Sequence, residues 1–168
     1  MAVFDLTAER LRELLSYDPD TGLFRWRSFR APGHKAGSVA GGYCAYGYIR
    51  IGVGQERHKA HRLAFLYMTG TYPPDDVDHI NGVRDDNRWQ NLRQVTRAMN
   101  CQNQRSARSN NKSGKFLGVA RIGTTNKFRA RIKVSGGPHQ HIGVFDTAEA
   151  AHAAYVEAKR RLHPGCTI

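Results

Sequence analysis

Apolar residues recur at helical spacing in two segments of the N-terminal half of the chain. Residues 8–17 follow Thr7, whose hydroxyl is suited to capping a helix N-terminus, and residues 61–70 end on Gly70, a typical C-terminal residue. Apolar side chains three or four positions apart share one face of a helix, so both segments are predicted to be helices packed on a core. The apolar faces consist of Leu11, Leu14 and Leu15 in the first segment and Leu63, Leu66 and Tyr67 in the second.

Short apolar runs between these helices predict β-strands. Residues 22–27 (GLFRWR) and 46–53 (YGYIRIGV) are rich in aromatic and β-branched side chains, and a glycine-rich segment separates them. The tyrosines of this region are expected to pack in the core or on the sheet rather than to stack on bases. They are Tyr43, Tyr46 and Tyr48.

The C-terminal third has the clearest pattern, three short strands followed by a long helix. The helix is predicted at residues 147–162, with Asp146 as its N-cap and Glu149 three positions later. Small residues on one face of this helix would let it lie close against a sheet. The predicted strands cover residues 116–122, 127–134 and 139–145.

The middle strand of this group alternates apolar and basic side chains. Successive strand residues point to opposite faces, so the apolar residues are expected to face the core while the cations share the other face. Like charges this close repel one another, and an all-basic face is therefore typical of a surface that phosphates neutralise. The candidate DNA contacts are Lys127, Arg129, Arg131 and Lys133, together with Arg121 on the neighbouring strand.

The net charge of +12 indicates a polyanionic partner, and its distribution is uneven. Residues 1–100 carry a net charge of +3, whereas residues 101–168 carry +9. Nucleic acid is favoured over a membrane because no basic amphipathic helix with a bulky apolar face is present. Residues 104–114, rich in serine, asparagine and basic side chains, predict a linker between domains at 1–103 and 115–168.

The sequence also predicts where the protein is found. No run approaches the eighteen or so apolar residues that cross a bilayer, and the first ten residues lack the pattern of a signal peptide. Its three cysteines are widely spaced, which suits a reducing compartment and disfavours a structural zinc site. We therefore expect a cytoplasmic protein.

Residues 113–165 resemble the AP2 DNA-binding domain of plant transcription factors and phage endonucleases. The resemblance is carried by FLGVAR, KFRARI and IGVFDTAEAAHAAYVEAKRRLHPG. It implies a three-stranded antiparallel sheet that lies in the DNA major groove and is backed by one helix. Residues 128, 129 and 131 depart from the plant pattern, which leaves any base preference open.

Residues 77–100 (VDHINGVRDDNRWQNLRQVTRAMN) combine carboxylates, amides and one imidazole. We expect a strand ending in Asp78 and His79, a long loop, a second strand that begins near Asn91, and a helix carrying Asn100. Phosphodiester hydrolysis needs a hard cation on the phosphate, a base that deprotonates water, and a group that orients the base. An aspartate, an asparagine carbonyl and a histidine supply these functions.

This stretch resembles the HNH endonucleases of the ββα-metal class, especially phage and homing nucleases. His79 is followed by Asn91 and then by Asn100 at the family spacing, and the similarity runs from about residue 46 to residue 104. It implies His79 as general base, Asn91 as the residue orienting it, and Asp78 and Asn100 as ligands of one Mg²⁺ or Mn²⁺ ion. Histidine is common at the last position, so Asn100 makes this an H-N-N variant.

Several neighbours have alternative interpretations. Asn87 and Asp86 are expected to stabilise the loop, although either residue is an alternative to Asn91 as the partner of His79. His61 is expected to be a core or helix-start residue more than a site residue. Three arginines are candidates either for phosphate contact or for ion pairs with Asp85 and Asp86. They are Arg84, Arg88 and Arg93.

Together these patterns predict an α+β protein with a ββα-metal nuclease core, an N-terminal helix and strands, and a linked AP2-like sheet and helix. The predicted function is metal-dependent cleavage of double-stranded DNA by a phage or mobile-element enzyme in the host-cell cytoplasm. A monomer or weak dimer with one site per chain would nick. The alternative is a DNA-binding regulator whose nuclease hairpin is inactive.

Overall fold

The computed structural model describes residues 6–29, 34–105, 107, 116–134 and 137–168. Within these residues the chain has four α-helices and several small sheets, which confirms the predicted mixed α+β class. No helix in the described ranges is long and apolar enough to cross a membrane. The chain divides into two compact units, Met1–Gln94 and Val95–Ile168. The predicted linker lies mostly outside the described residues, so the predicted domain boundaries stay predictions.

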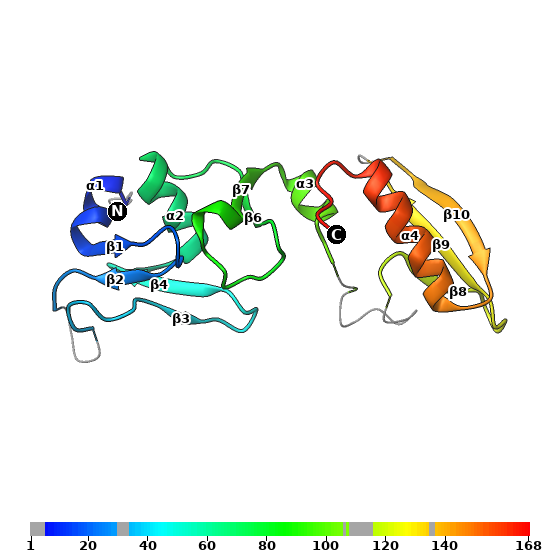
Figure 1. Ribbon diagram of the computed structural model, residues 1–168, viewed down its shortest axis with the longest axis horizontal. Helices are drawn as coiled ribbons and strands as arrows, with labels where there is room; N and C mark the ends of the chain where they lie inside the picture. The colour runs from blue at the N-terminus through cyan, green and yellow to red at the C-terminus, as the bar shows by residue number, and fades with distance from the viewer. Residues whose placement is uncertain (1–5, 30–33, 106, 108–115, 135–136) are drawn as a thin grey trace. The chain divides into compact units, whose positions relative to one another are not determined.

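The first unit begins with a helix and continues through two small antiparallel sheets to a second helix (Figure 1). Thr7 caps the first helix, since its hydroxyl accepts a hydrogen bond from the backbone N–H of Arg10. This helix ends at Leu14, earlier than predicted, because residues 15–17 pair as a strand with Phe24–Trp26. The elements are α1 (Ala8–Leu14), β1 (Leu15–Tyr17), β2 (Phe24–Trp26), β3 (Gly42–Tyr43), β4 (Ile49–Val53), β5 (Glu56–Lys59) and α2 (Ala60–Thr69).

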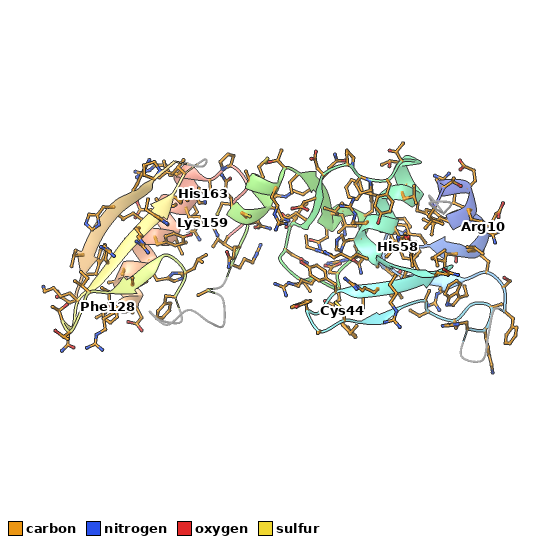
Figure 2. All side chains as sticks on the ribbon, turned by 180° about the vertical axis from the view of Figure 1, so that it is seen from behind. Arg10, Cys44, His58, Phe128, Lys159 and His163 are labelled. Atoms are coloured by element: carbon orange, nitrogen blue, oxygen red, sulfur yellow. The ribbon has the colours of Figure 1, made fainter. Side chains whose placement is uncertain are left out.

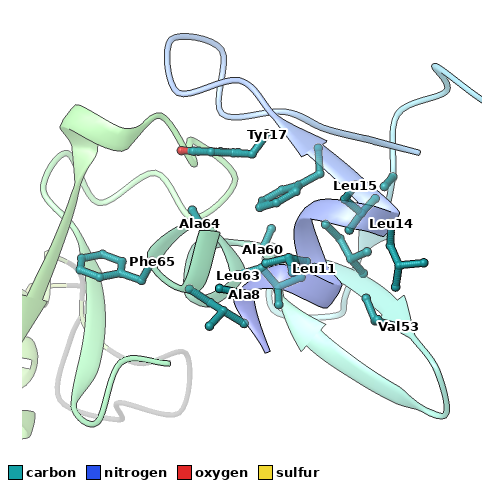
Figure 3. Close-up of a cluster of buried hydrophobic side chains, with 14 of the residues drawn as sticks. Ala8, Leu11, Leu14, Leu15, Tyr17, Val53, Ala60, Leu63, Ala64 and Phe65 are labelled. Atoms are coloured by element: carbon teal, nitrogen blue, oxygen red, sulfur yellow. The ribbon is translucent and has the colours of Figure 1, made fainter. Parts of the chain in front are cut away.

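The core of the first unit gathers side chains from α1, α2, the β1–β2 hairpin and β4 of the sheet β3–β4–β5. β4 is the middle strand of that sheet, and its Ile51 and Val53 are buried whereas Arg50 is exposed. Figure 3 shows Leu11 of α1 and Leu63 of α2 within this cluster, and both side chains are fully excluded from solvent. The predicted apolar faces of the two helices therefore meet inside one core.

A two-stranded sheet, β6–β7, follows α2. Val77 and Leu92, one from each strand, are buried in the core of the first unit and anchor the hairpin there. A helix then begins after Thr96, whose hydroxyl accepts a hydrogen bond from the N–H of Met99. This is the order of elements expected for residues 77–104. The elements are β6 (Asp76–His79), the 3₁₀ helix η1 (Trp89–Asn91), β7 (Leu92–Val95) and α3 (Arg97–Gln102).

The second unit contains an antiparallel sheet in the order β10–β9–β8, with a long helix packed on one face (Figure 1). Ala130 and Ile132 of the middle strand share a buried cluster with Tyr155 of the helix. Figure 2 labels Lys159 and His163 near the C-terminal end of that helix, and both side chains are buried. The elements are β8 (Val119–Arg121), β9 (Phe128–Lys133), β10 (His139–Phe145) and α4 (Ala148–Leu162).

Two local predictions about side chains were wrong. Thr147, not Asp146, caps α4, because the Thr147 hydroxyl accepts a hydrogen bond from the N–H of Ala150. Tyr43 and Tyr46 do not pack in the core, since both side chains are 73 % exposed. Tyr43 lies on β3 and Tyr46 in the turn between β3 and β4, and both residues are exposed to solvent.

Candidate active site

Asp78 and His79 lie next to each other at the end of β6, and both are buried. Neighbouring strand residues point to opposite faces, so the two side chains have different partners. The carboxylate of Asp78 accepts hydrogen bonds from Nε and Nη2 of Arg93, on β7, at 3.2 and 3.0 Å. The acid of the predicted motif is therefore held by the second strand of the hairpin.

The imidazole of His79 meets Asn87, whose Oδ1 lies 3.3 Å from Nε2. Asn87 is only 3 % exposed, and its Nδ2 donates to the carbonyl of Asp85 at 3.0 Å. The backbone carbonyl of Asn87 accepts a 2.7 Å hydrogen bond from the hydroxyl of Tyr17, on β1. Asn87 thus makes the contact to the ring that was expected of Asn91. The sequence had offered Asn87 as an alternative partner of His79.

Asn91 is buried and uses its side chain to hold the loop between the strands. Its Oδ1 accepts a hydrogen bond from the backbone N–H of Asn81 at 2.9 Å, and its Nδ2 donates to the carbonyl of Asp86 at 2.7 Å. The carboxylate of Asp86 also pairs with Arg88 at 2.6 Å, and this bond holds its pKa down at about 2. Asn91 and Asp86 together fix the path of the loop that carries Asn87.

Two further rings border the imidazole of His79. The ring of His61, from α2, lies edge-on to it with centroids 4.9 Å apart, and the ring of Tyr48 lies 6.0 Å away. His61 is buried, as expected of a core histidine, and its Nδ1 has no hydrogen-bond partner among the described residues. His61 also borders the ring of His79, and the sequence did not predict this contact.

Burial is the largest influence on the protonation of both histidines. It lowers the pKa of His79 below its ordinary value, while the hydrogen bond to Asn87 and the charge of Asp78 act in the opposite direction. Burial and the neighbouring His79 lower the pKa of His61 to about 3. His79 is therefore neutral at pH 7 and able to accept a proton.

The donors around His79 suit some metal ions better than others. Across the described parts of the chain, no group of three or more histidine, cysteine, aspartate or glutamate side chains is arranged to hold one. A buried carboxylate such as Asp78 still fits Mg²⁺, which keeps several waters and takes only one or two carboxylates together with phosphate oxygens. The site therefore suits a hard, hydrated cation and does not suit structural zinc.

Asn100, the second predicted ligand, lies on α3. This helix belongs to the second unit, whereas Asp78 and His79 belong to the first. Its side chain is partly buried. The role of Asn100 as a metal ligand stays a prediction.

The basic strand of the second unit has the predicted alternation. Arg129, Arg131 and Lys133 of β9 are exposed, while Ala130 and Ile132 between them are buried. Strand β10 adds imidazoles to the same exposed face, because its histidines pair across the sheet with two of these cations. The pairs are His141 with Arg131 and His139 with Lys133.

Two other predicted DNA contacts are engaged elsewhere. Arg121 pairs across the sheet with Phe128, which places it on the face opposite Arg129, and its guanidinium donates to the carbonyl of Thr125 at 2.9 Å. Lys127 forms a 3.0 Å ion pair with Asp146. The strand register separates Arg121 from the group formed by Arg129, Arg131 and Lys133, whereas Lys127 differs from that group in having an acidic partner.

Residues 58–102 match a family model described as HNH endonuclease. The matched segment includes α2, the β6–β7 hairpin and α3, and so contains every predicted catalytic and metal-binding residue. Searches of curated proteins and of solved structures gave no match. In the segment that carries Asp78, His79 and Asn91, the chain is similar to HNH endonucleases, a similarity that supports a nuclease acting on DNA.

Proposed function

We propose that this protein is a metal-dependent endonuclease that hydrolyses phosphodiester bonds in double-stranded DNA, with His79 as the general base. The observation that carries the proposal is a buried imidazole whose Nε2 lies 3.3 Å from Oδ1 of Asn87, one strand position after the buried carboxylate of Asp78. It lies within the segment that matches the HNH endonuclease family. A buried base with a lowered pKa and an orienting amide is suited to activating water.

In this proposal, three residues of the first unit have distinct roles. His79 takes a proton from a water molecule, which then attacks phosphorus. Asn87 keeps the ring in one orientation through its contact with Nε2. Asn91 acts one step further away by fixing the loop through Asn81 and Asp86, so its substitution would disturb Asn87 and the imidazole indirectly.

Asp78 and Asn100 are proposed to hold one Mg²⁺ or Mn²⁺ ion, in keeping with their hard oxygen donors. When bound, such an ion supplies positive charge that stabilises the phosphorane and the departing oxygen. Arg93 neutralises Asp78 through hydrogen bonds of 3.0 and 3.2 Å, so the carboxylate is already directed and charge-balanced by β7.

The second unit is proposed to anchor the enzyme on duplex DNA, as in AP2-like modules. Arg129, Arg131 and Lys133 supply a row of exposed cations for the phosphates. One site per chain predicts nicking by a monomer, with double-strand cleavage requiring two copies or two visits. The AP2-like module and the H-N-N motif extend the proposal to a phage or mobile-element enzyme.

The proposal is tested by relaxation of supercoiled plasmid with Mg²⁺ or Mn²⁺. Wild-type protein is expected to nick, and His79→Ala is expected to lose about 10²–10⁴-fold in rate because the base is removed. EDTA should abolish nicking reversibly, and binding of the same DNA should survive the substitution.

His58→Ala is the matched control, because His58 is a partly buried histidine on β5 whose Nε2 lies 3.7 Å from the carboxylate of Glu56. It should leave nicking intact. Undiminished cutting by purified His79→Ala would refute the assignment of the base. Tight DNA binding by the wild type with no nicking under any ion would instead identify a regulator with an inactive hairpin.

A further inference from the structure

Two cations lie over the ring of Tyr48. The Nζ of Lys59 is 4.8 Å from the ring centroid, and the guanidinium carbon of Arg84 is 5.2 Å from it. Lys59 is the last residue of β5, whereas Arg84 comes from the loop between β6 and β7. Elements from different parts of the first unit thus bring two positive charges to one aromatic side chain. We call Tyr48, Lys59 and Arg84 the Tyr48 cluster.

Neither cation has an acidic partner in the described part of the chain. The nearby loop carboxylates have other partners, since Asp85 accepts a hydrogen bond from Tyr43 at 2.8 Å and Asp86 pairs with Arg88. Lys59 even lies directly across the sheet from Arg50, an exposed cation. Like charges in such a pair destabilise a sheet, so this arrangement indicates a surface that a polyanion neutralises.

The Tyr48 cluster borders the candidate base directly. The ring of Tyr48 is 6.0 Å from the ring of His79 and 5.3 Å from the ring of His61. Tyr48 thus contacts both cations and adjoins the imidazole, which places Lys59 and Arg84 in the surroundings of the candidate base. The charge of Lys59 also contributes to the lowered pKa of His61, which is consistent with this proximity.

An exposed aromatic turn adjoins the cluster. Arg84 donates from Nη1 to the backbone carbonyl of Tyr46 at 2.8 Å, which ties its loop to the turn between β3 and β4. Tyr46 in that turn and Tyr43 at the end of β3 are each 73 % exposed. Exposed aromatic rings among cations are typical of surfaces that bind nucleic acid strands, and the cations meet the backbone phosphates.

We propose that the Tyr48 cluster is a second DNA-binding site, in which Lys59 and Arg84 bind backbone phosphates adjacent to the scissile bond and Tyr46 lies against the same strand. This inference rests on the proposed endonuclease function. It assigns DNA contact to the first unit, independently of the basic strand in the second unit. The site positions the strand at His79, so it acts on binding and orientation and not on proton transfer.

The test measures binding of duplex DNA in EDTA, where no cleavage takes place, as a function of salt concentration. Lys59→Ala and Arg84→Ala are each expected to reduce the logarithmic salt slope by about 0.9, and the double variant by about 1.8, because each phosphate contact releases counterions. Arg10→Ala is the matched control, since Arg10 is an exposed cation on α1 already paired with Glu13. It should leave the slope unchanged.

Lys59→Arg and Arg84→Lys keep the charge and are expected to restore the wild-type slope, which separates a phosphate contact from a packing role. In the plasmid assay with Mg²⁺, the alanine variants should show reduced kcat/KM, mainly through KM. An unchanged slope in the double alanine variant would overturn the proposal, even if nicking fell. Failure of the endonuclease proposal would give a different result. The wild-type protein would then bind DNA with its full logarithmic salt slope but would not nick the plasmid.

Discussion

At the scale of single residues, the site depends on what surrounds His79. Burial lowers its pKa, and Asn87 meets its Nε2 at 3.3 Å. The base form of the ring is therefore retained below pH 6.5, where an ordinary histidine would begin to protonate. The acidic limb of a pH–rate profile governed by His79 should accordingly lie below pH 6.5.

The Asn87→Asp variant tests this arrangement. It replaces a neutral amide oxygen with a carboxylate that favours the imidazolium, so the pKa of His79 should rise and the acidic limb should move to higher pH by about one unit or more. Activity lost at pH 6 should return at pH 8. Profiles of kcat against pH provide the measurement, together with NMR titration of the histidines in metal-free protein.

Asn87→Ala is the companion variant. It removes the orienting contact and, with it, an interaction that raises the pKa of His79. We expect a lower plateau in its profile without a shift of the acidic limb to higher pH. An unshifted profile in Asn87→Asp would show that the ring does not meet residue 87 during the reaction.

At the scale of elements, the N-terminal hairpin β1–β2 supports the loop that holds Asn87. The Tyr17 hydroxyl bonds to the carbonyl of Asn87, and the backbone N–H of Trp89 donates to the carbonyl of Pro19 at 2.9 Å. Gly22 approaches so closely that a Cβ there would lie 2.5 Å from the backbone of Asn87 and Arg88. The β1–β2 hairpin therefore supports the candidate site.

Gly22→Ala should accordingly damage both stability and activity. The substitution forces Asn87 and Arg88 away, and the cost should reach about 1–3 kcal/mol in the free energy of unfolding, with a fall in kcat. Gly37→Ala is the matched control, because Gly37 has a similar positive φ (78° against 74°) but nothing within 4 Å of the added carbon. Denaturant unfolding and plasmid nicking of both variants give the comparison, and equal effects would contradict the support role.

At the scale of the whole molecule, the positive charge is concentrated in the C-terminal part of the chain. Residues 101–168 hold a net charge of +9, and Arg129, Arg131 and Lys133 present part of it on one exposed face. The first unit holds little net charge and uses its acids internally, as in the pairs of Asp78 with Arg93 and Asp86 with Arg88. Affinity is therefore expected to come mainly from the second unit.

Replacing Arg129 and Arg131 together with alanine should weaken DNA binding and lower the logarithmic salt slope by about 1.8. Arg161→Ala is the control, since Arg161 is an exposed cation on α4, the helix that covers the other face of the sheet. Fluorescence anisotropy at several salt concentrations measures both. An unchanged slope in the double variant would mean that the basic face does not contact phosphate.

The sequence by itself determined most of the elements and the chemistry they offer. Alternation in β9, helical spacing in α2 and the cap at Thr7 are local patterns, and each predicted its element because it depends only on neighbouring residues. The same locality explains the error at α1, where strand pairing with Phe24–Trp26 ended the helix before the predicted residue 17.

Tertiary structure decided which side chains meet. Asn87 rather than Asn91 contacts His79 because the loop is held by Tyr17, 70 positions away, and by the close approach of Gly22. Arg84 lies over the ring of Tyr48 and does not pair with the loop acids, whereas Arg88 and Arg93 form ion pairs. Such choices depend on the path of the backbone between distant elements, which no local pattern of residues encodes.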